Sequence, residues 1–278
     1  MKSPFLKLAH SRWIKMINSL DKEILGRGNI ESYKFIVSNS NYSFNIQKNT
    51  TTKIHLFLDV LNESKLVFNI FENSNVELIL ISTGSCSYEV EINIERDSNL
   101  KLYTADSFNT DVSITKSVNL KGINASVYAY EYIPSNDSNI TGAFKLNHLY
   151  QDTKSEGIFN YLANGTGTIN RDTISTMEEN TFNANSSENI KGLILSETSR
   201  IDAKPILIIK CDDVHASHGC AIGTINANEI YYLMSRGLTY NDALKIICKS
   251  LINPILREIT DDDFLSITKP ILDKTIGE

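Results

Sequence analysis

Two cysteines and two histidines lie within ten residues, in the segment CDDVHASHGC at 211–220. Cys211, His215, His218 and Cys220 offer thiolate and imidazole groups, the ligands that zinc, iron and iron–sulfur clusters take from proteins. Their order, C-x3-H-x2-H-x-C, matches no standard zinc-finger spacing. If the segment is extended, alternation also places His215 and His218 on opposite faces. We therefore expect a partial site, completed by a second subunit or filled transiently, rather than a closed site of four ligands.

A structural interpretation of the same segment stays open. The apolar run 206–209 precedes it and a helical pattern follows at 229–236, so it is a candidate for the corner between them. Asp212, Asp213, Ser217 and His218 can hydrogen-bond the backbone of such a corner, which also contains Gly219. Nucleophilic catalysis is a weaker hypothesis, because no family-type motif surrounds either cysteine.

The remaining polar residues allow one other kind of chemistry. A solenoid that binds or cleaves polysaccharide needs paired carboxylates, or acidic and basic groups together, on one of its faces. The available sets are Asp152 with Glu156, and Arg171 with Asp172, Glu178 and Glu179. Charged residues on a solvated face are the ordinary expectation for these positions.

The middle of the chain has the alternation typical of β-strands. From Tyr33 to Ile209 apolar residues recur at every second position, as in Ile54, Leu56 and Leu58. Turns rich in Asn, Asp and Ser separate the strands, and NSNVEL, DSNLKL and GINASV recur at roughly two dozen residues, the length of a solenoid coil. We predict a mainly β fold, a right-handed parallel β-helix, with a β-sandwich as the alternative.

Both ends of the chain have helical periodicity. An amphipathic pattern covers 3–25, and the C-terminal patterns cover 229–236, a segment that begins at Thr239, and another that begins at 261–263. Thr239 and Asp242 have capping-box spacing. Pro254 is expected to kink or interrupt its helix, and Pro270 to limit the next one. We expect an N-terminal helix in 1–28, a β-helix core in 30–223 and a helical subdomain in 224–278.

Composition excludes several classes of function. A net charge of −6 and no dense cluster of Lys and Arg argue against nucleic acid or an anionic membrane as a partner. The apolar runs are far shorter than the ~20 residues of a membrane span, and the N-terminus has no secretory-signal pattern. Four cysteines in this length do not indicate a disulfide scaffold. We expect a cytoplasmic protein.

The segment from Leu193 to Gly237 resembles the signature of the SufB/SufD family, the scaffold proteins of SUF iron–sulfur cluster assembly. The resemblance covers about 140–258, including an H…T-x-S pattern formed by His148, Thr153 and Ser155. The matching pieces are L-x-LS at 193–196, IDA-x-P at 201–205, DDV-x-x-SHG at 212–219, I-G at 222–223 and YYL-x-SRG-L at 231–238.

The resemblance implies a non-catalytic scaffold of parallel β-helix fold that dimerises with itself or with a second SufB/SufD-type subunit. His218 corresponds to the family histidine implicated in assembling a transient iron–sulfur cluster. Many members have a cysteine where this chain has Ala216, so Cys211 and Cys220 are the nearby substitutes. A purely structural member without assembly activity is an alternative, as is a polysaccharide-binding solenoid. The sequence does not show which sulfur donor serves this chain or whether it uses a flavin.

The resemblance also implies a partner for the C-terminal helices. In this family they dock a SufC-type ABC ATPase, and residues 229–256 correspond to the docking helices. The residues expected to contribute are Tyr231, Tyr232, Arg236, Gly237, Leu244, Leu251 and Pro254.

Overall fold

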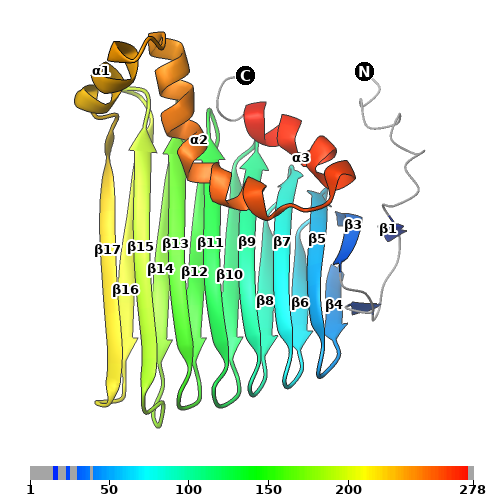
Figure 1. The fold of residues 1–278 in the computed structure, drawn as a ribbon. Coiled ribbons are helices and arrows are strands. Elements are labelled where there is room, and N and C mark those ends of the chain that lie inside the picture. The colour runs from blue at the N-terminus through cyan, green and yellow to red at the C-terminus, as the bar shows by residue number, and fades with distance from the viewer. Residues whose placement is uncertain (1–14, 18–22, 26–29, 38–39, 275–278) are drawn as a thin grey trace.

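The computed structural model describes residues 15–17, 23–25, 30–37 and 40–274, and its strands form two parallel sheets (Figure 1). The odd sheet contains β1 (Lys15–Ile17), β3 (Ile30–Val37), β5 (Thr51–Val60), β7 (Asn75–Gly84), β9 (Asn99–Phe108), β11 (Ser126–Ser135), β13 (Lys154–Ala163), β15 (Ala184–Ile194) and β17 (Val214–Thr224). The even sheet contains β2 (Glu23–Leu25), β4 (Ser40–Ile46), β6 (Ser64–Ile70), β8 (Tyr88–Ile94), β10 (Val112–Leu120), β12 (Asn139–His148), β14 (Thr168–Met177) and β16 (Arg200–Ile209).

The chain alternates between the sheets and advances one coil at a time. Each strand pairs in parallel with the strand two positions along, so that Asn75 of β7 lies beside Thr51 of β5 and Asn99 of β9. This is a β-solenoid, which confirms the predicted mainly β fold. The sandwich alternative is wrong for the described strands, because such sandwiches are built from antiparallel sheets.

Alternation along the strands separates the interior from the outer faces. Ile54, Leu56 and Leu58 of β5 belong to the core between the sheets and are at most 1% exposed. The intervening His55 and Phe57 point to the other face but are buried as well. Helices cover the outer face of the odd sheet. Residues on both sides of β5 are therefore buried, and the polarity of its side chains does not show which side faces solvent.

Three helices, α1 (Ala227–Ser235), α2 (Tyr240–Glu258) and α3 (Asp262–Lys274), follow the last strand. α2 and α3 run back across the odd sheet from the last coils toward the first (Figure 1). Cys248, Ile252 and Phe264 pack there with residues of β5 to β15 in a second apolar cluster. Thr239 caps α2 as predicted, since its side chain accepts a hydrogen bond from the N–H of Asp242. In the part of the chain that the structure describes, no helix is long and apolar enough to cross a membrane.

Polar contacts fix the turn before α3 to the first coils. Ser32 Oγ donates to Asp261 Oδ2 over 2.5 Å and lies 3.0 Å from His55 Nδ1. The other carboxylate oxygen of Asp261 accepts from the N–H of Phe264, so Asp261 caps α3 while it holds β3. Burial, reinforced by the charge of Lys53, lowers the pKa of His55 to about 4 and keeps the ring neutral.

The predicted Asx-rich corners are confirmed. Asn73, Asp97 and Asn124 occupy equivalent turns with φ of 57°, 55° and 61°, a left-handed conformation that Asn and Asp adopt more readily than other side chains. On the outer face of the even sheet, an in-register ladder of amides joins five strands. The ladder begins with Asn45, which only accepts. The side-chain nitrogen of each later member donates to the side-chain oxygen of the one before it over 2.8–2.9 Å, in Asn69, Asn93, Asn119 and Asn147.

Two helix predictions need correction. Most of the helix expected over 3–25 lies outside the described residues, but 15–17 and 23–25 within it are short strands, which find backbone partners on β3 and β4. Pro254 does not interrupt α2, which continues to Glu258, and Pro270 does not limit α3, which continues to Lys274. Packing against the sheet offsets the lost backbone hydrogen bond, since Ile255 and Leu272 just beyond the prolines are fully buried.

Candidate functional site at the open end of the solenoid

The segment rich in Cys and His forms the last strand of the odd sheet. β17 pairs with β15 on one side only, and β16 is likewise the last strand of the even sheet within the described residues. The predicted corner is therefore confined to the residues before Val214, while Ser217 and Gly219 lie inside the strand. At the corner Asp212 and Asp213 are exposed, and the backbone oxygen of Asp213 accepts from the N–H of Asn183 over 2.7 Å. Among the described residues no further coil covers this segment, so its polar side chains remain accessible.

His218 and Cys220 share the interior-facing side of β17. His218 is in register with Glu188 of β15, and Cys220 with Ile190. Glu188 points between the sheets, where Ser175 and Thr173 of β14 donate to its two oxygens over 2.7 and 3.0 Å. Because in-register residues of neighbouring strands face the same way, the imidazole and the thiol lie at the open mouth of the solenoid.

The other two candidate ligands lie elsewhere. His215 is in register with Asn185 and, by alternation, faces outward from the odd sheet, as the sequence predicted. Cys211 lies in the turn between β16 and β17 and is half-buried. Among the described residues no three His, Cys, Asp or Glu side chains converge as a metal site. The chain thus provides a pair, His218 and Cys220, rather than four converging ligands.

Burial raises the pKa values of two acidic groups near the mouth, Cys220 and Glu188. Partial burial raises the pKa of the Cys220 thiol, whose sulfur is 3.8 Å from the backbone oxygen of Ala203. Burial also raises the pKa of Glu188, an effect that hydrogen bonds from Ser175 and Thr173 and the nearby His218 reduce. Binding a metal ion would therefore require the thiol to lose its proton, which metal coordination itself promotes.

A hydrogen-bonded chain leads inward from Glu188. It runs from Ser175 through Ser186 and Ser155 to His148, with successive contacts of 2.8 Å. Thr153 lies 2.8 Å from the other ring nitrogen of His148, so the H…T-x-S pattern of the sequence is a buried polar cluster. Burial lowers the pKa of His148 to about 4, and the ring is neutral.

A buried ionic network, which the sequence interpretation missed, lies deeper between the sheets. Glu131 accepts from Lys116 over 2.9 Å and from Arg171 over 3.0 and 3.1 Å, and Lys116 also pairs with Asp106. All four side chains are at most 1% exposed. Arg171, suggested above for a surface groove, is thus in the interior. The alternation of residues along β10 could have revealed this burial, because Lys116 lies two positions after Ile114 and therefore on the same, interior side of the strand.

The expected docking residues divide between surface and core. Tyr231 and Tyr232 of α1 are 75% and 58% exposed, and the guanidinium of Arg236 stacks 5.4 Å from the ring of Tyr232. Gly237 has φ of 95°, the left-handed conformation expected after a helix. Leu244 and Pro254 are half-buried in α2. Leu251 is only 2% exposed because it packs on the odd sheet, so it is not part of a docking surface.

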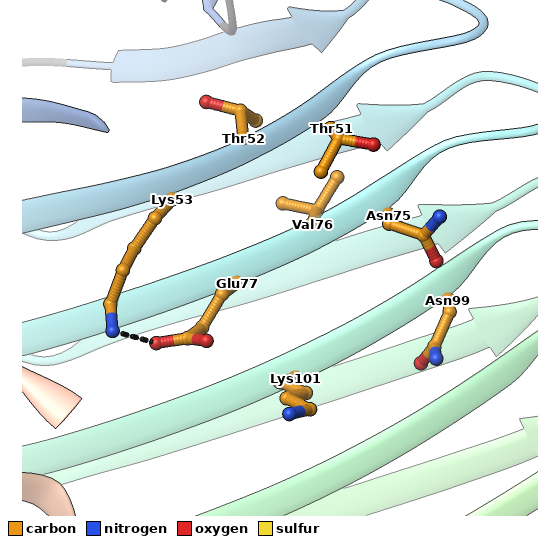
Figure 2. Close-up of a pocket in the computed structure, with 8 residues that line it drawn as sticks. All are labelled: Thr51, Thr52, Lys53, Asn75, Val76, Glu77, Asn99 and Lys101. Atoms are coloured by element: carbon orange, nitrogen blue, oxygen red, sulfur yellow. Dashed lines mark ion pairs between the residues drawn. The ribbon is translucent and has the colours of Figure 1, made fainter. Parts of the chain in front are cut away.

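A separate polar groove crosses the odd sheet at β5, β7 and β9 (Figure 2). In the strand order of that sheet, β11, β13 and β15 lie between this groove and β17. Its volume is about 350 Å³, and Lys53 within it pairs with Glu77. Its other polar lining residues are Thr51, Thr52, Asn75, Asn99 and Lys101. None of the residues that line it is a cysteine or histidine, so this groove offers no ligand pair like that of β17.

Comparisons with known proteins show the family to which the chain belongs. Residues 36–251 match the family described as "SUF system FeS cluster assembly, SufBD core domain". The chain is similar to the iron–sulfur cluster assembly protein SufD of Bacillus subtilis, with 36% identity over 86 residues, 31% of this chain and 20% of that protein. A SufBD family protein of Pyrococcus horikoshii is 38% identical over 79 residues, 28% of this chain and 18% of its own.

SufD of Escherichia coli is 34% identical over 70 residues, 25% of this chain and 16% of that protein. The aligned stretches thus cover a fifth or less of the length of these three relatives. The family match, by contrast, extends from β3 into α2 and includes both β17 and the coils before it. The chain belongs to the SufBD family of SUF-system iron–sulfur cluster assembly proteins.

Proposed function

We propose that this chain is a non-catalytic cytoplasmic scaffold on which an iron–sulfur cluster is transiently assembled at an interface with a second subunit. The observation that carries the proposal is that His218 and Cys220 both lie on the interior side of β17, the last strand of the odd sheet, which pairs with β15 along one edge only. Imidazole and thiolate suit iron and iron–sulfur clusters, and two ligands from one chain leave the rest of the coordination to another.

The open end of the solenoid suits association with another SufBD-type subunit, either a second copy or a relative. β16 and β17 have 10 and 11 residues, and each presents an edge of backbone N–H and C=O groups that can pair with another strand. Ile208 and Ile209 of β16 are 42% and 47% exposed at this end. Strand pairing here would cover the edges and the apolar side chains and bring the partner's ligands toward His218.

The surface of α1 and the start of α2 suits a second partner, an ABC ATPase of the SufC type. Tyr231, Tyr232 and Tyr240 are more than half exposed, an aromatic surface of the kind enriched at protein interfaces. A groove of about 370 Å³ between the helices is lined by Tyr232, Leu233 and Ile247. The ATPase would supply the energy for rearrangement, since the scaffold itself carries out no chemical step.

Anaerobic reconstitution with ferrous iron and sulfide tests the cluster site. We expect sulfide-linked iron absorbance that weakens in His218→Ala and in Cys220→Ala. The matched controls are His215→Ala and Cys211→Ser, which change the same residue types away from the mouth. Unchanged spectra in both His218→Ala and Cys220→Ala would contradict the site and favour the purely structural alternative.

Copurification with a SufC-type ATPase tests the docking surface. Deleting α2 and α3 would expose the apolar face of the odd sheet, so substitutions on the surface are the better probe. We expect Tyr231→Ser with Tyr232→Ser to abolish association at micromolar concentration. Phe71→Ser, at an exposed residue in a distant turn, is the control. If wild type fails to associate, or the double variant still does, the docking proposal is wrong.

A further inference from the structure

Three bulky apolar side chains lie exposed on consecutive coils of the solenoid. Ile123, Tyr150 and Phe182 are 40%, 48% and 48% exposed, and we call them the edge ridge. They belong to the turns that follow β10, β12 and β14. These turns lie along the edge of the solenoid opposite α1 and α2 (Figure 1), so the edge ridge is distinct from the helix surface discussed above.

The backbone holds the edge ridge in a fixed arrangement. Asn124 N–H donates to Gln151 O over 3.4 Å, and Asp152 N–H donates to Phe182 O over 2.9 Å, so the three turns form a ladder of their own. Asn124, Asp152 and Asn183 have φ of 61°, 59° and 59°, which repeats the same corner on each coil. Adjacent coils in such a ladder are about 5 Å apart, close enough for one partner segment to span all three.

The turns around the edge ridge are acidic. The segments 121–124, 149–152, 178–183 and 210–213 contain five carboxylates and two lysines, so they hold −3 of the chain's net charge of −6. Lys210 is paired with Glu178 over 2.7 Å, which neutralises one lysine and one carboxylate. Glu179, Asp212 and Asp213 are exposed. An apolar ridge with an acidic rim is complementary to a positively charged segment.

We propose that the edge ridge binds a basic segment of a partner protein that also carries an apolar or aromatic side chain. Tyr and Phe are effective anchors, because they bury a large area while losing little conformational freedom. The turn backbone is already ordered, so binding does not have to fix it. The acidic rim accelerates association with a cationic segment and selects against acidic ones.

A peptide-binding experiment tests the proposal on the full chain. The probe is a fluorescent octapeptide of alternating lysine and leucine, followed by fluorescence anisotropy, with alternating glutamate and leucine as the control peptide. We expect Tyr150→Ser with Phe182→Ser to weaken binding about tenfold or more, the cost of removing anchor residues. Glu179→Gln with Asp213→Asn should weaken it less and reduce its salt dependence. Leu61→Ser, 46% exposed in a turn after β5, should change nothing.

Three results would overturn the proposal. The first is equal binding by wild type and the Tyr150→Ser, Phe182→Ser variant, with melting curves showing both folded. The second is equal binding of the glutamate peptide, which would remove the role of charge. The third is a wild-type dimer in sedimentation that dissociates only in the Tyr150→Ser, Phe182→Ser variant, which would assign the edge ridge to a second copy of this chain.

Discussion

Replacing Glu131 by Gln should destabilise the solenoid strongly although it removes no volume. Glu131 is fully buried and accepts hydrogen bonds from Lys116, Arg171 and Tyr161. A Gln amide has one acceptor and one donor group, so a donor would then face Lys116 or Arg171. The two buried cations would also share a single carboxylate, that of Asp106. Breaking one member of a buried ionic network costs about 3–5 kcal/mol.

Calorimetry and denaturant unfolding measure this loss. For a chain of this size, about 3–5 kcal/mol corresponds to a fall in Tm of roughly 6–20 °C. Glu156→Gln is the matched control, since Glu156 is exposed on the outer face of β13, and it should change stability by less than about 0.5 kcal/mol. A Glu131→Gln variant that loses less than about 1 kcal/mol would refute the claim that the network is held together by its charges.

The same variant has a defined pH dependence. Burial alone would raise the pKa of Glu131, but the charges of Arg171 and Lys116 outweigh it and hold the pKa below its ordinary value of 4.5. A carboxyl group whose pKa is lower in the folded than in the unfolded state stabilises the fold at pH values above its unfolded-state pKa. This stabilisation is lost as the pH falls through the folded-state pKa. The stability gap between wild type and Glu131→Gln should therefore be constant from neutral pH to about 4.5 and close only below it.

Three further outcomes follow from local geometry. The pKa of His55 in the folded protein is about 4, below its ordinary value of 6.5. As pH falls from 6.5 to 4, the free energy of unfolding of wild type should therefore decrease by up to about 3 kcal/mol relative to that of His55→Gln, as measured by denaturant unfolding. Gly142→Ala should lower Tm, because φ is 118° and its Cβ would lie 2.1 Å from the oxygen of Ile114, whereas Gly223→Ala meets no atom within 4 Å and should not. Thr239→Ala removes the cap of α2 and should cost about 1 kcal/mol in denaturant unfolding, with a far-UV spectrum close to wild type.

Sequence alone determined the parts of this protein that depend on local rules. Alternation along β5 identified its interior side, because each strand must place every second residue between the sheets. Asx-rich repeats identified the turns between the strands, because Asn and Asp adopt the left-handed conformation found there more readily than other side chains. The cap at Thr239 and the extended separation of His215 from His218 were likewise predictable, because both depend only on neighbouring residues.

Only the tertiary structure determined the features that depend on contacts between residues far apart in the sequence. Lys116 and Arg171 are buried because carboxylates from other strands meet them between the sheets, a pairing that no sequence spacing reveals. Leu251 and the helix beyond Pro254 are fixed by packing on the odd sheet, which overrides local helix signals. The Cys- and His-rich segment is a strand with one bare edge because the solenoid ends there, and this position places His218 beside Cys220 at its mouth.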